Sequence, residues 1–440
     1  MPSSTSATRP WNRTRTTWTP TRTTRIPTTR TPTTRIRATP TPTQKTRASA
    51  LARSLDPVSS EEFLAEHWEQ RPLVVPRGEQ GRFDDLLSVA DVERLLTSGG
   101  LRFPGFRLAK AGAKLEVADY TKDLSWRPQP FSGTADVERV LAEFEDGATI
   151  VLQGLHLNWQ PLAEFCRSLE TELGHPAQAN AYFTPRAAQG LPVHHDTHDV
   201  FSLQVAGEKR WLVYEPAWEL PLKHQRYKAE TMGEPGEPVL DVTLQAGDTL
   251  YLPRGWLHEA KTSETDSLHL TMGVNVYTWM DAFRAALDSC AREVGFRRSP
   301  GGEDPGDLLD LLAGQLQPED IERRRRRKLV RTRRPVLGGQ LSQLRALESL
   351  DVDTVVERRA TVLFDLEGAT LSFEGKDLTF PDEAAEDLAF VAQSDEPFTP
   401  ADLPGELDGE GRLVFVRGLV REGFLVISAA ARENDADAEA

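Results

Sequence analysis

The stretch LPVHHDTH at 191–198 holds three histidines and one aspartate, in a chain with only nine histidines altogether. In a strand, successive side chains point to opposite faces, so His194, Asp196 and His198 share one face while His195 takes the other. One imidazole and one carboxylate would then converge on a single point, which predicts a metal site. We expect His198 to lie beside the metal ligands or to face a substrate, and His195 to be structural.

A third ligand is expected from the downstream stretch AGDTLYLPRGWLH, which ends at His258. Turn residues around Gly247 and Gly255 predict two bends, with the histidine at the start of the strand that follows. Two histidines and one carboxylate on one face of a metal leave three positions open, which suits non-haem Fe(II) and its oxygen chemistry. A histidine in a strand is more often an ordinary hydrogen-bonded residue, but the two motifs together favour metal binding. The predicted ligands are His194, Asp196 and His258.

A cation is expected near this metal, in the stretch VAGEKRW. Iron of this type needs an organic co-substrate at two open positions, and a buried cation could hold its remote carboxylate because an unpaired buried charge is costly. After the turn at 206–208, alternation points Lys209 and Trp211 one way and Arg210 the other. A lysine beside a turn is usually exposed, but the metal motif nearby leads us to predict Lys209 as a carboxylate anchor.

The residues around these motifs predict mainly strands. Short alternating or apolar runs separated by glycine and proline are typical of a β-barrel or sandwich, and they occur as ATIVLQGL, ANAYFTP, VFSLQVAGEKRWLVYEP, PVLDVTLQAGDTLYLP and SLHLTMGVNVY. Upstream, Ser59 is placed to cap a helix, with Glu62 completing a capping box. From about 279 to 350 the apolar spacing becomes helical, and 355–428 combines strand-like and helical runs in the manner of a small winged-helix-like module.

The predicted domain organisation follows these changes of pattern. The first segment is rich in Thr, Arg and Pro and cannot bury enough apolar surface to fold, so we expect it to be disordered. We therefore expect a disordered tail at 1–48, a β domain carrying the site at 49–278, a helical region at 279–354, a winged-helix-like domain at 355–430 and an acidic tail at 431–440.

Charge is unevenly distributed along the chain. The net charge is −15, but residues 1–50 hold nine Arg and one Lys without Asp or Glu, so the remainder carries −25. This acidic body argues against general affinity for nucleic acid or an anionic membrane. The run RRRRRKLVRTRRP at 323–335 could form a nucleic-acid patch, but such a run is more often a solvated helix face or pairs with acidic surface on a neighbouring domain. Nineteen acidic and five basic residues at 363–440 should repel DNA.

The cysteines and the hydropathy bear on the compartment. Cys166 and Cys290 are too few for a disulfide framework, so we expect a reducing environment. No stretch approaches 18 consecutive apolar residues, and the N-terminus lacks the apolar region of a secretory signal. These features favour a cytoplasmic protein without a membrane span.

Taken together, the motifs resemble the JmjC-type, cupin-fold 2-oxoglutarate oxygenases, and among them the ribosomal oxygenases that hydroxylate a side chain of a ribosomal protein. The resemblance covers roughly residues 50–430 and includes FLAEHWEQRPLVV, LPVHHDTHDVFSLQVAGEKRWLVY, LYLPRGWLHEA and SLHLT. It implies an α+β fold, in which a double-stranded β-helix (the cupin/JmjC jelly roll) precedes a helical dimerisation region and a C-terminal winged-helix-like module. A homodimer is therefore expected.

The resemblance also assigns roles to individual residues. It implies Fe(II) at His194, Asp196 and His258, and Lys209 paired with the distal carboxylate of 2-oxoglutarate. Further contacts to the pocket are implied for Asn180, Tyr182 and Thr271. The sequence departs from the family pattern at two places, because Thr197 and His198 stand where an acidic or apolar pair is expected and Gly273 stands where relatives tend to place a further Ser or Thr. Lys209 is similar to the branch that acts on histidine, whereas a branch acting on arginine uses Arg as the anchor.

The implied activity is hydroxylation of an Arg or His side chain in a basic protein, coupled to conversion of 2-oxoglutarate to succinate. The acidic body suits such a basic substrate. N-methyl-lysine demethylation by the same oxidation is an alternative, as is a non-catalytic cupin scaffold that binds a basic protein. A Zn or Mn cupin isomerase would usually have a more His-rich ligand set without a buried lysine. Sequence-specific DNA binding is not expected.

Overall fold

The computed structural model describes residues 49–126, 129–301 and 304–428, all of which belong to one compact unit that spans Pro42–Ala440. The predicted tails at 1–48 and 431–440 lie outside the described residues. Among the described residues, no helix combines the length and the hydropathy needed to span a bilayer.

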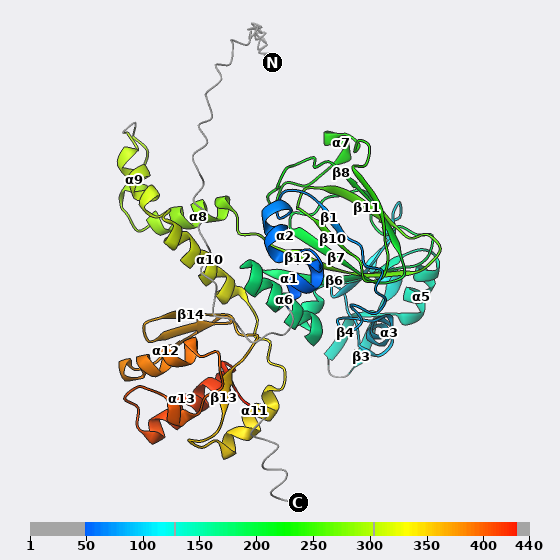
Figure 1. The fold of residues 1–440 in the computed structure, drawn as a ribbon. Coiled ribbons are helices and arrows are strands. Elements are labelled where there is room, and N and C mark those ends of the chain that lie inside the picture. The colour runs from blue at the N-terminus through cyan, green and yellow to red at the C-terminus, as the bar shows by residue number, and fades with distance from the viewer. Residues whose placement is uncertain (1–48, 127–128, 302–303, 429–440) are drawn as a thin grey trace, which may run out of the picture. The chain divides into compact units, whose positions relative to one another are not determined.

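Two antiparallel sheets form the centre of the fold (Figure 1). The larger sheet, in the order β1-β10-β7-β12-β6-β5-β2, contains β1 (Leu73–Val75), β2 (Phe106–Ala109), β5 (Thr149–Leu152), β6 (Ala177–Thr184), β7 (Asp199–Ala206), β10 (Thr249–Leu252) and β12 (Ser267–Val274). The smaller sheet, in the order β11-β8-β9, contains β8 (Lys209–Tyr214), β9 (Leu240–Leu244) and β11 (Leu257–Lys261). Consecutive strands change sheet at β7–β8 and at β10–β11, as in a jelly roll.

The change of sheet between β7 and β8 depends on Gly207. Its φ of +64° lies in the left-handed region, and a Cβ there would lie 1.8 Å from the backbone oxygen of Asp266. Only glycine fits this turn. The turn therefore fixes where β8 begins, and with it the direction of the side chain of Lys209, its first residue.

Alternation along the larger sheet separates an apolar face from a polar one. On one face, Ala181, Leu203 and Leu270 pack into the main hydrophobic core. That core is covered by helices α1 (Ala50–Leu55), α2 (Ser60–Glu66), α3 (Val89–Ser98), α5 (Val137–Glu145) and α6 (Gln160–Leu173), with the short η1 (Leu155–Leu157). The opposite face lies toward the smaller sheet, and a second apolar cluster that includes Val200 and Val213 joins the two sheets.

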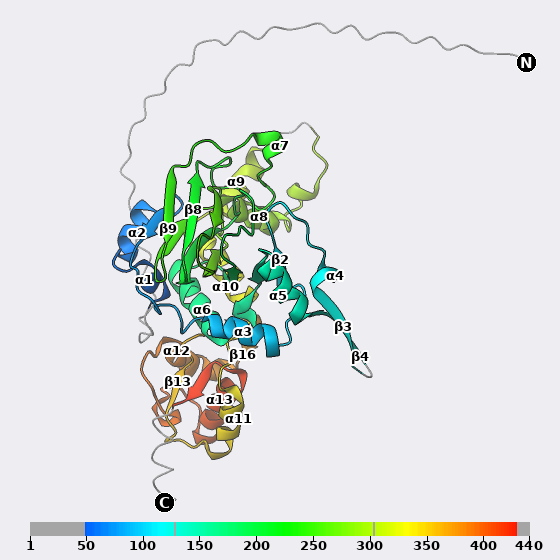
Figure 2. The ribbon, with the colours of Figure 1, turned by 90° about the vertical axis from the view of Figure 1, so that its right-hand side faces the viewer.

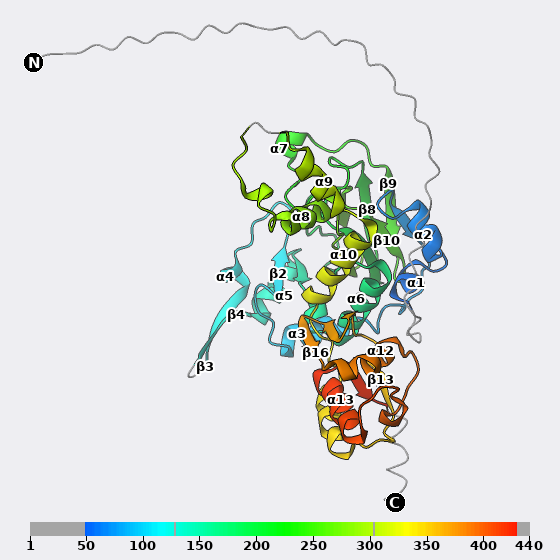
Figure 3. The same cartoon turned by 90° about the vertical axis from the view of Figure 1, so that its left-hand side faces the viewer.

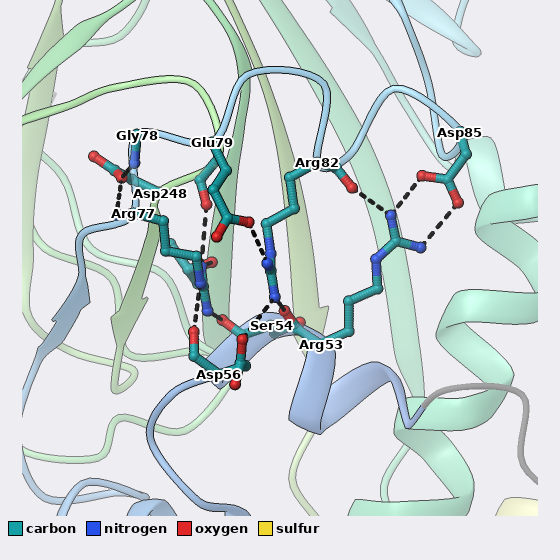
Figure 4. Close-up of polar contacts among 11 residues, drawn as sticks. Arg53, Ser54, Asp56, Arg77, Gly78, Glu79, Arg82, Asp85 and Asp248 are labelled. Carbon is teal, nitrogen blue, oxygen red and sulfur yellow. Dashed lines mark hydrogen bonds and ion pairs between the residues drawn. The ribbon is translucent and has the colours of Figure 1, made fainter.

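The N-terminal segment is fixed to this core by arginines (Figure 4). Arg77 donates from its side chain to the backbone oxygens of Ser54 (2.9 Å) and Gly247 (3.1 Å), while its own N–H and that of Gly78 donate to Oδ1 of Asp248. The other carboxylate oxygen of Asp248 accepts the N–H of Gln245 at 2.7 Å. This carboxylate therefore stabilises the turn that leads into β10, and the predicted first bend is confirmed.

The predicted capping box at Ser59 is confirmed in part. Ser59 caps α2 by accepting the Glu62 N–H at 3.1 Å, but among the described residues the Glu62 side chain does not accept the Ser59 N–H in return. After α4 (Val117–Tyr120), strands β3 (Thr121–Trp126) and β4 (Gln129–Ala135) pair as a hairpin that extends away from the sheets (Figures 2 and 3).

The predicted helical region begins at α8, where Thr278 and Asp281 form a capping box. The short α7 (Ala229–Met232) lies between β8 and β9. The helices after the sheets are α8 (Trp279–Cys290), η2 (Gly295–Arg297), α9 (Gly306–Gly314), α10 (Pro318–Thr332), α11 (Gln340–Ala346) and η3 (Leu347–Ser349). The arginine run lies on α10 and pairs with protein acids, as in Arg325–Glu322 (2.8 Å), Arg331–Asp377 (2.9 Å), Arg327–Glu367 and Lys328–Asp281. The interpretation that the run pairs with neighbouring acidic surface is therefore confirmed.

The C-terminal module has its own hydrophobic core, built around Phe373, Phe415 and Phe424. Its elements are β13 (Val356–Arg358), β14 (Phe364–Glu367), β15 (Thr370–Phe373), β16 (Lys376–Thr379), η4 (Asp382–Ala384), α12 (Ala385–Gln393), η5 (Pro400–Asp402), α13 (Gly409–Glu422) and β17 (Leu425–Ile427). Arg167 of α6 reaches into this module and pairs with buried Glu374 at 2.7 Å. The winged-helix-like assignment stays a prediction.

Candidate metal centre

The three predicted metal ligands lie together in the structure. We call His194, Asp196 and His258 the triad. One nitrogen or oxygen from each lies within 4.8 Å of those of the other two, and the two imidazole centroids are 4.4 Å apart. Nδ1 of His194 bonds the Pro192 carbonyl at 2.8 Å, and Nδ1 of His258 bonds the Trp256 carbonyl at 3.0 Å. Because a carbonyl can only accept, each Nδ1 carries the proton and each Nε2 keeps a lone pair for a metal.

The triad converges for a different reason from the one expected. Residues 191–198 do not form a strand, and β7 begins only at Asp199. His194 and His258 instead form an isolated bridge, in which the N–H of His194 donates to the His258 carbonyl at 3.1 Å and the N–H of His258 donates to the His194 carbonyl at 2.8 Å. The Asp196 carbonyl accepts the Gly255 N–H at 3.0 Å, so the backbone of Asp196 is hydrogen-bonded to the loop before β11. The expectation of strand alternation at 194–198 was therefore wrong.

Electrostatics at the triad favour a cation. Burial and the neighbouring His194 lower the pKa of His258 to about 4. Burial alone would raise the pKa of Asp196, but His198 and His258 outweigh it and the pKa is lowered. Near neutral pH the carboxylate is charged and the His258 imidazole is neutral, which are the forms that bind a divalent metal. His195 lies elsewhere and bonds the Gln225 carbonyl at 3.0 Å, consistent with a structural role.

Lys209 lines the same cavity as the triad. Its side chain is buried at 4% exposure and donates to Oγ1 of Thr184 at 2.9 Å, and that hydroxyl also accepts a bond of 3.0 Å from Thr149. No carboxylate in the described part of the chain pairs with it, and burial lowers the pKa of the amine to about 7. The alternation predicted for this strand agrees with the burial of Lys209 and Trp211 and the exposure of Arg210. A buried amine without a counter-charge is the kind of group that an anionic ligand would satisfy.

The other expected pocket residues are placed differently from one another. Tyr182 and Thr271 line the cavity, whereas Asn180 does not, and its Oδ1 accepts the Gly154 N–H at 2.9 Å. Asn180 nevertheless lies directly opposite Thr271 in the β6–β12 pairing, so it stands at the edge of the same polar face.

Sequence reasoning missed Ser202 and His269 as polar groups of this cavity, and it placed Trp211 on the face of Lys209 without giving it a role. Ser202 lies opposite Thr271, Trp211 follows Lys209 on the same face, and His269 stacks on Tyr182 with centroids 4.9 Å apart. Ser202 Oγ, Trp211 Nε1 and His269 Nδ1 are buried and have no hydrogen-bond partner among the described residues. Strand parity could have placed Trp211 and His269, since each lies two residues from Lys209 or Thr271 on the same strand, whereas Ser202 is brought there by the pairing of β7 with β12.

Residues 155–282 match the family model of the JmjC domain. The chain contains a JmjC domain. It is 36% identical over 218 residues to ribosomal oxygenase 1 of Gallus gallus, covering 49% of this chain and 35% of that protein. It is 31% identical over 223 residues to a bifunctional lysine-specific demethylase and histidyl-hydroxylase of Drosophila persimilis, covering 50% and 31%. The matched region therefore spans about a third of the length of these two curated relatives.

Solved structures share the fold of the JmjC domain and its surroundings. The ribosomal oxygenase YcfD of Escherichia coli gives a TM-score of 0.51 at 18% identity, covering 84% of this chain and 98% of that one. A structure of YcfD in complex with cobalt and 2-oxoglutarate gives 0.52 at 19% identity, covering 84% and 99%. The predicted JmjC/cupin-type fold is therefore confirmed, while the dimerisation and winged-helix assignments stay predictions.

Proposed function

We propose that this chain is an Fe(II)- and 2-oxoglutarate-dependent oxygenase that hydroxylates an arginine or histidine side chain of a ribosomal protein. The observation that carries the proposal is Lys209, a buried amine with no carboxylate partner in the described residues, which lines the same cavity as the triad. Two histidines and a carboxylate would suit several metals. The unpaired amine adds a requirement for an anionic ligand beside that metal.

The residues of the cavity fit both Fe(II) and 2-oxoglutarate. His194, Asp196 and His258 would hold the iron, and Lys209 would hold the distal carboxylate of 2-oxoglutarate. Hydrogen-bond capacity for the carboxylate oxygens is available from the unpartnered Ser202, Trp211 and His269, together with Thr271. When bound, the two groups activate O₂, so that one oxygen atom enters a substrate C–H bond as a hydroxyl and the other enters succinate, with release of CO₂.

The protein's own contribution is to bind the co-substrate, to orient the metal ligands and to exclude water from the cavity. Lys209 would neutralise the distal carboxylate of the co-substrate in the cavity, and the hydroxyl pair of Thr149 and Thr184 holds the amine in place. The backbone carbonyls of Pro192 and Trp256 hold both triad imidazoles in one tautomer. The walls formed by Val200 and Trp211 exclude water. No acid–base pair is needed for this reaction.

A ribosomal protein is proposed as the substrate because curated relatives are ribosomal oxygenases and because the body is acidic. Residues 51–440 carry a net charge of −25, which attracts a basic partner. Raising the ionic strength should therefore slow association with the substrate. An association rate that does not depend on salt would remove this support.

The proposal is tested by mass spectrometry of ribosomal proteins from cells with and without this protein, and with the Asp196→Ala variant. We expect one peptide to gain one oxygen atom on an Arg or His, and to lose this gain in the variant. Loss of a methyl group from a lysine would instead identify a demethylase, an activity named for the Drosophila relatives. Unchanged ribosomal proteins together with an unchanged variant phenotype would favour a non-catalytic scaffold.

We also propose that the chain forms a homodimer through α8 and α9. Trp279 is 69% exposed, and Phe283 and Leu287 follow on the same helix at spacings of four residues, with 46% and 50% exposure. On α9, Leu309 is 58% exposed. An exposed apolar stripe of this kind is typical of an interaction surface.

Cys166 and Cys290 are buried and unpaired, which supports the proposal of a cytoplasmic location.

A further inference from the structure

The two departures from the family pattern, His198 and Gly273, are in contact. A Cβ added to Gly273 on β12 would lie 3.0 Å from Cε1 and 3.1 Å from Nδ1 of the His198 imidazole. These distances are shorter than ordinary van der Waals contact, so a methyl group at this position would require the ring to move by a few tenths of an ångström. The glycine therefore provides the space in which His198 lies, and it lies there beside Asp196.

The two oxygens of Asp196 face different neighbours. Oδ2 lies 3.9 Å from Nε2 of His258, on the side of the triad, whereas Oδ1 lies 4.0 Å from Nε2 of His198. Oδ2 therefore faces the proposed metal position, and Oδ1 faces the imidazole of His198. His198 is not a member of the ligand cluster and does not line the cavity, so neither metal ligation nor contact with the co-substrate accounts for it.

The number of oxygens that Asp196 gives to a metal decides how many positions stay open. A carboxylate that binds through one oxygen leaves three positions of an octahedral ion free beside two histidines, and one that binds through both leaves two. The proposed reaction needs three, two for 2-oxoglutarate and one for O₂. Restraint of the second oxygen would therefore preserve the open site.

We propose that His198 is a positioning residue that donates from Nε2 to Oδ1 of Asp196 and so keeps this carboxylate a one-oxygen metal ligand, with Gly273 providing the space. The inference rests on the metal site of the proposed function. The 4.0 Å separation is about 1 Å longer than an N–H···O hydrogen bond, so it must shorten when a metal is bound. The carboxamide of Gln178, whose Cγ also packs near Gly273, is the neighbouring polar side chain on β6.

The test uses the full chain and Co(II), which is stable in air and whose visible absorption depends on its coordination number. His198→Ala should weaken Co(II) binding by about 10- to 100-fold. It should also change the visible spectrum and weaken 2-oxoglutarate binding to the Co(II) form. His198→Gln, whose amide can donate from a similar position, should restore most of the Co(II) affinity, the visible spectrum and the 2-oxoglutarate affinity. Wild-type affinity and spectrum in the alanine variant would overturn the inference.

A second comparison tests the role of Gly273. Gly273→Ala presses on the imidazole and should change the spectrum and the Co(II) affinity in the same direction as His198→Ala, by a smaller amount. In the double variant the losses should not add, because both changes remove the same contact. Additive losses would overturn the coupling between the two residues.

Asp196→Ala separates the inference from the function on which it rests. This variant should lose Co(II) binding altogether if the triad is the metal site. Unchanged binding in Asp196→Ala would remove the proposed site and the inference together. Lost binding there, combined with unaltered His198 variants, would leave the site in place and overturn the inference alone. Circular dichroism of every variant checks that the fold is kept.

Discussion

Asp199 and Arg254 form a buried ion pair, with Nη1 of Arg254 2.9 Å from Oδ2 of Asp199. Asp199 follows the loop that carries Asp196, and Arg254 lies four residues before His258, so this pair joins the two loops that supply the triad. The hydroxyl of Tyr251 donates to the remaining oxygen of Asp199 at 2.9 Å. The metal centre therefore depends on a charge pair that no ligand motif reveals.

Breaking this pair should be costly. Asp199→Asn leaves Arg254 with only the partly exposed Glu69 as a carboxylate partner, and we expect it to lower the free energy of unfolding by about 1.5–3 kcal/mol. Divalent metal binding should weaken as well, because the two loops would no longer be held together. Chemical denaturation and metal titration measure both effects. Arg210→Ala, which removes the exposed pair with Asp241, is the matched control and should leave both nearly unchanged.

Removing the buried amine should stabilise the ligand-free protein. Lys209→Met should raise the free energy of unfolding by about 1–2 kcal/mol, because it relieves the cost of burying an unpaired amine. The folded pKa of about 7 lies below the usual lysine pKa of 10.5, so the unfolded chain binds the proton more tightly. Stability of the wild type therefore rises with pH between these values, and the advantage of the variant should be largest below pH 7.

The same variant should lose its response to 2-oxoglutarate. Thermal unfolding of the Co(II)-loaded wild type should shift upward with 2-oxoglutarate, and that of Lys209→Met should not. Arg210→Met, on the opposite face of β8, should behave as the wild type. An equal shift in all three proteins would mean that Lys209 does not anchor the carboxylate.

Binding of 2-oxoglutarate should weaken as the pH rises. A carboxylate favours the charged form of Lys209, and with a pKa of about 7 in the free protein this form is present below pH 7 and lost above it. Because His258 has a pKa of about 4, it stays neutral throughout this range. We expect the dissociation constant to be about tenfold higher at pH 8 than at pH 6. Calorimetry in buffers of different ionisation enthalpy would detect the proton taken up, and Lys209→Arg should abolish the pH dependence.

Oligomeric state tests the apolar stripe on α8. Phe283→Glu places a charge in the proposed interface and should convert a dimer to a monomer in light scattering. Val414→Glu, at a 63% exposed position on α13, is the control and should not change the mass. A wild type that is monomeric at micromolar concentration would rule out the dimer.

The sequence alone was sufficient for features with a local cause. Alternation with a period of two placed Lys209 and Trp211 inside and Arg210 outside, because that pattern depends only on the strand itself. The turns at Gly247 and Gly255 were predictable for the same reason, since a positive φ is a property of one residue. The triad was identified from residue types and motif spacing, although the strand assumed for His194 was wrong.

What the sequence could not determine were the partners of these residues. The bridge between His194 and His258, the pair Asp199–Arg254 and the contact of His198 with Gly273 each join segments that lie far apart along the chain. Such contacts depend on strand register and on how loops pack, and no local pattern contains that information. The sequence by itself therefore determined which side chains are available for chemistry and which face each strand residue takes. Only the tertiary structure decided which groups meet, because burial and pairing arise when distant segments come together.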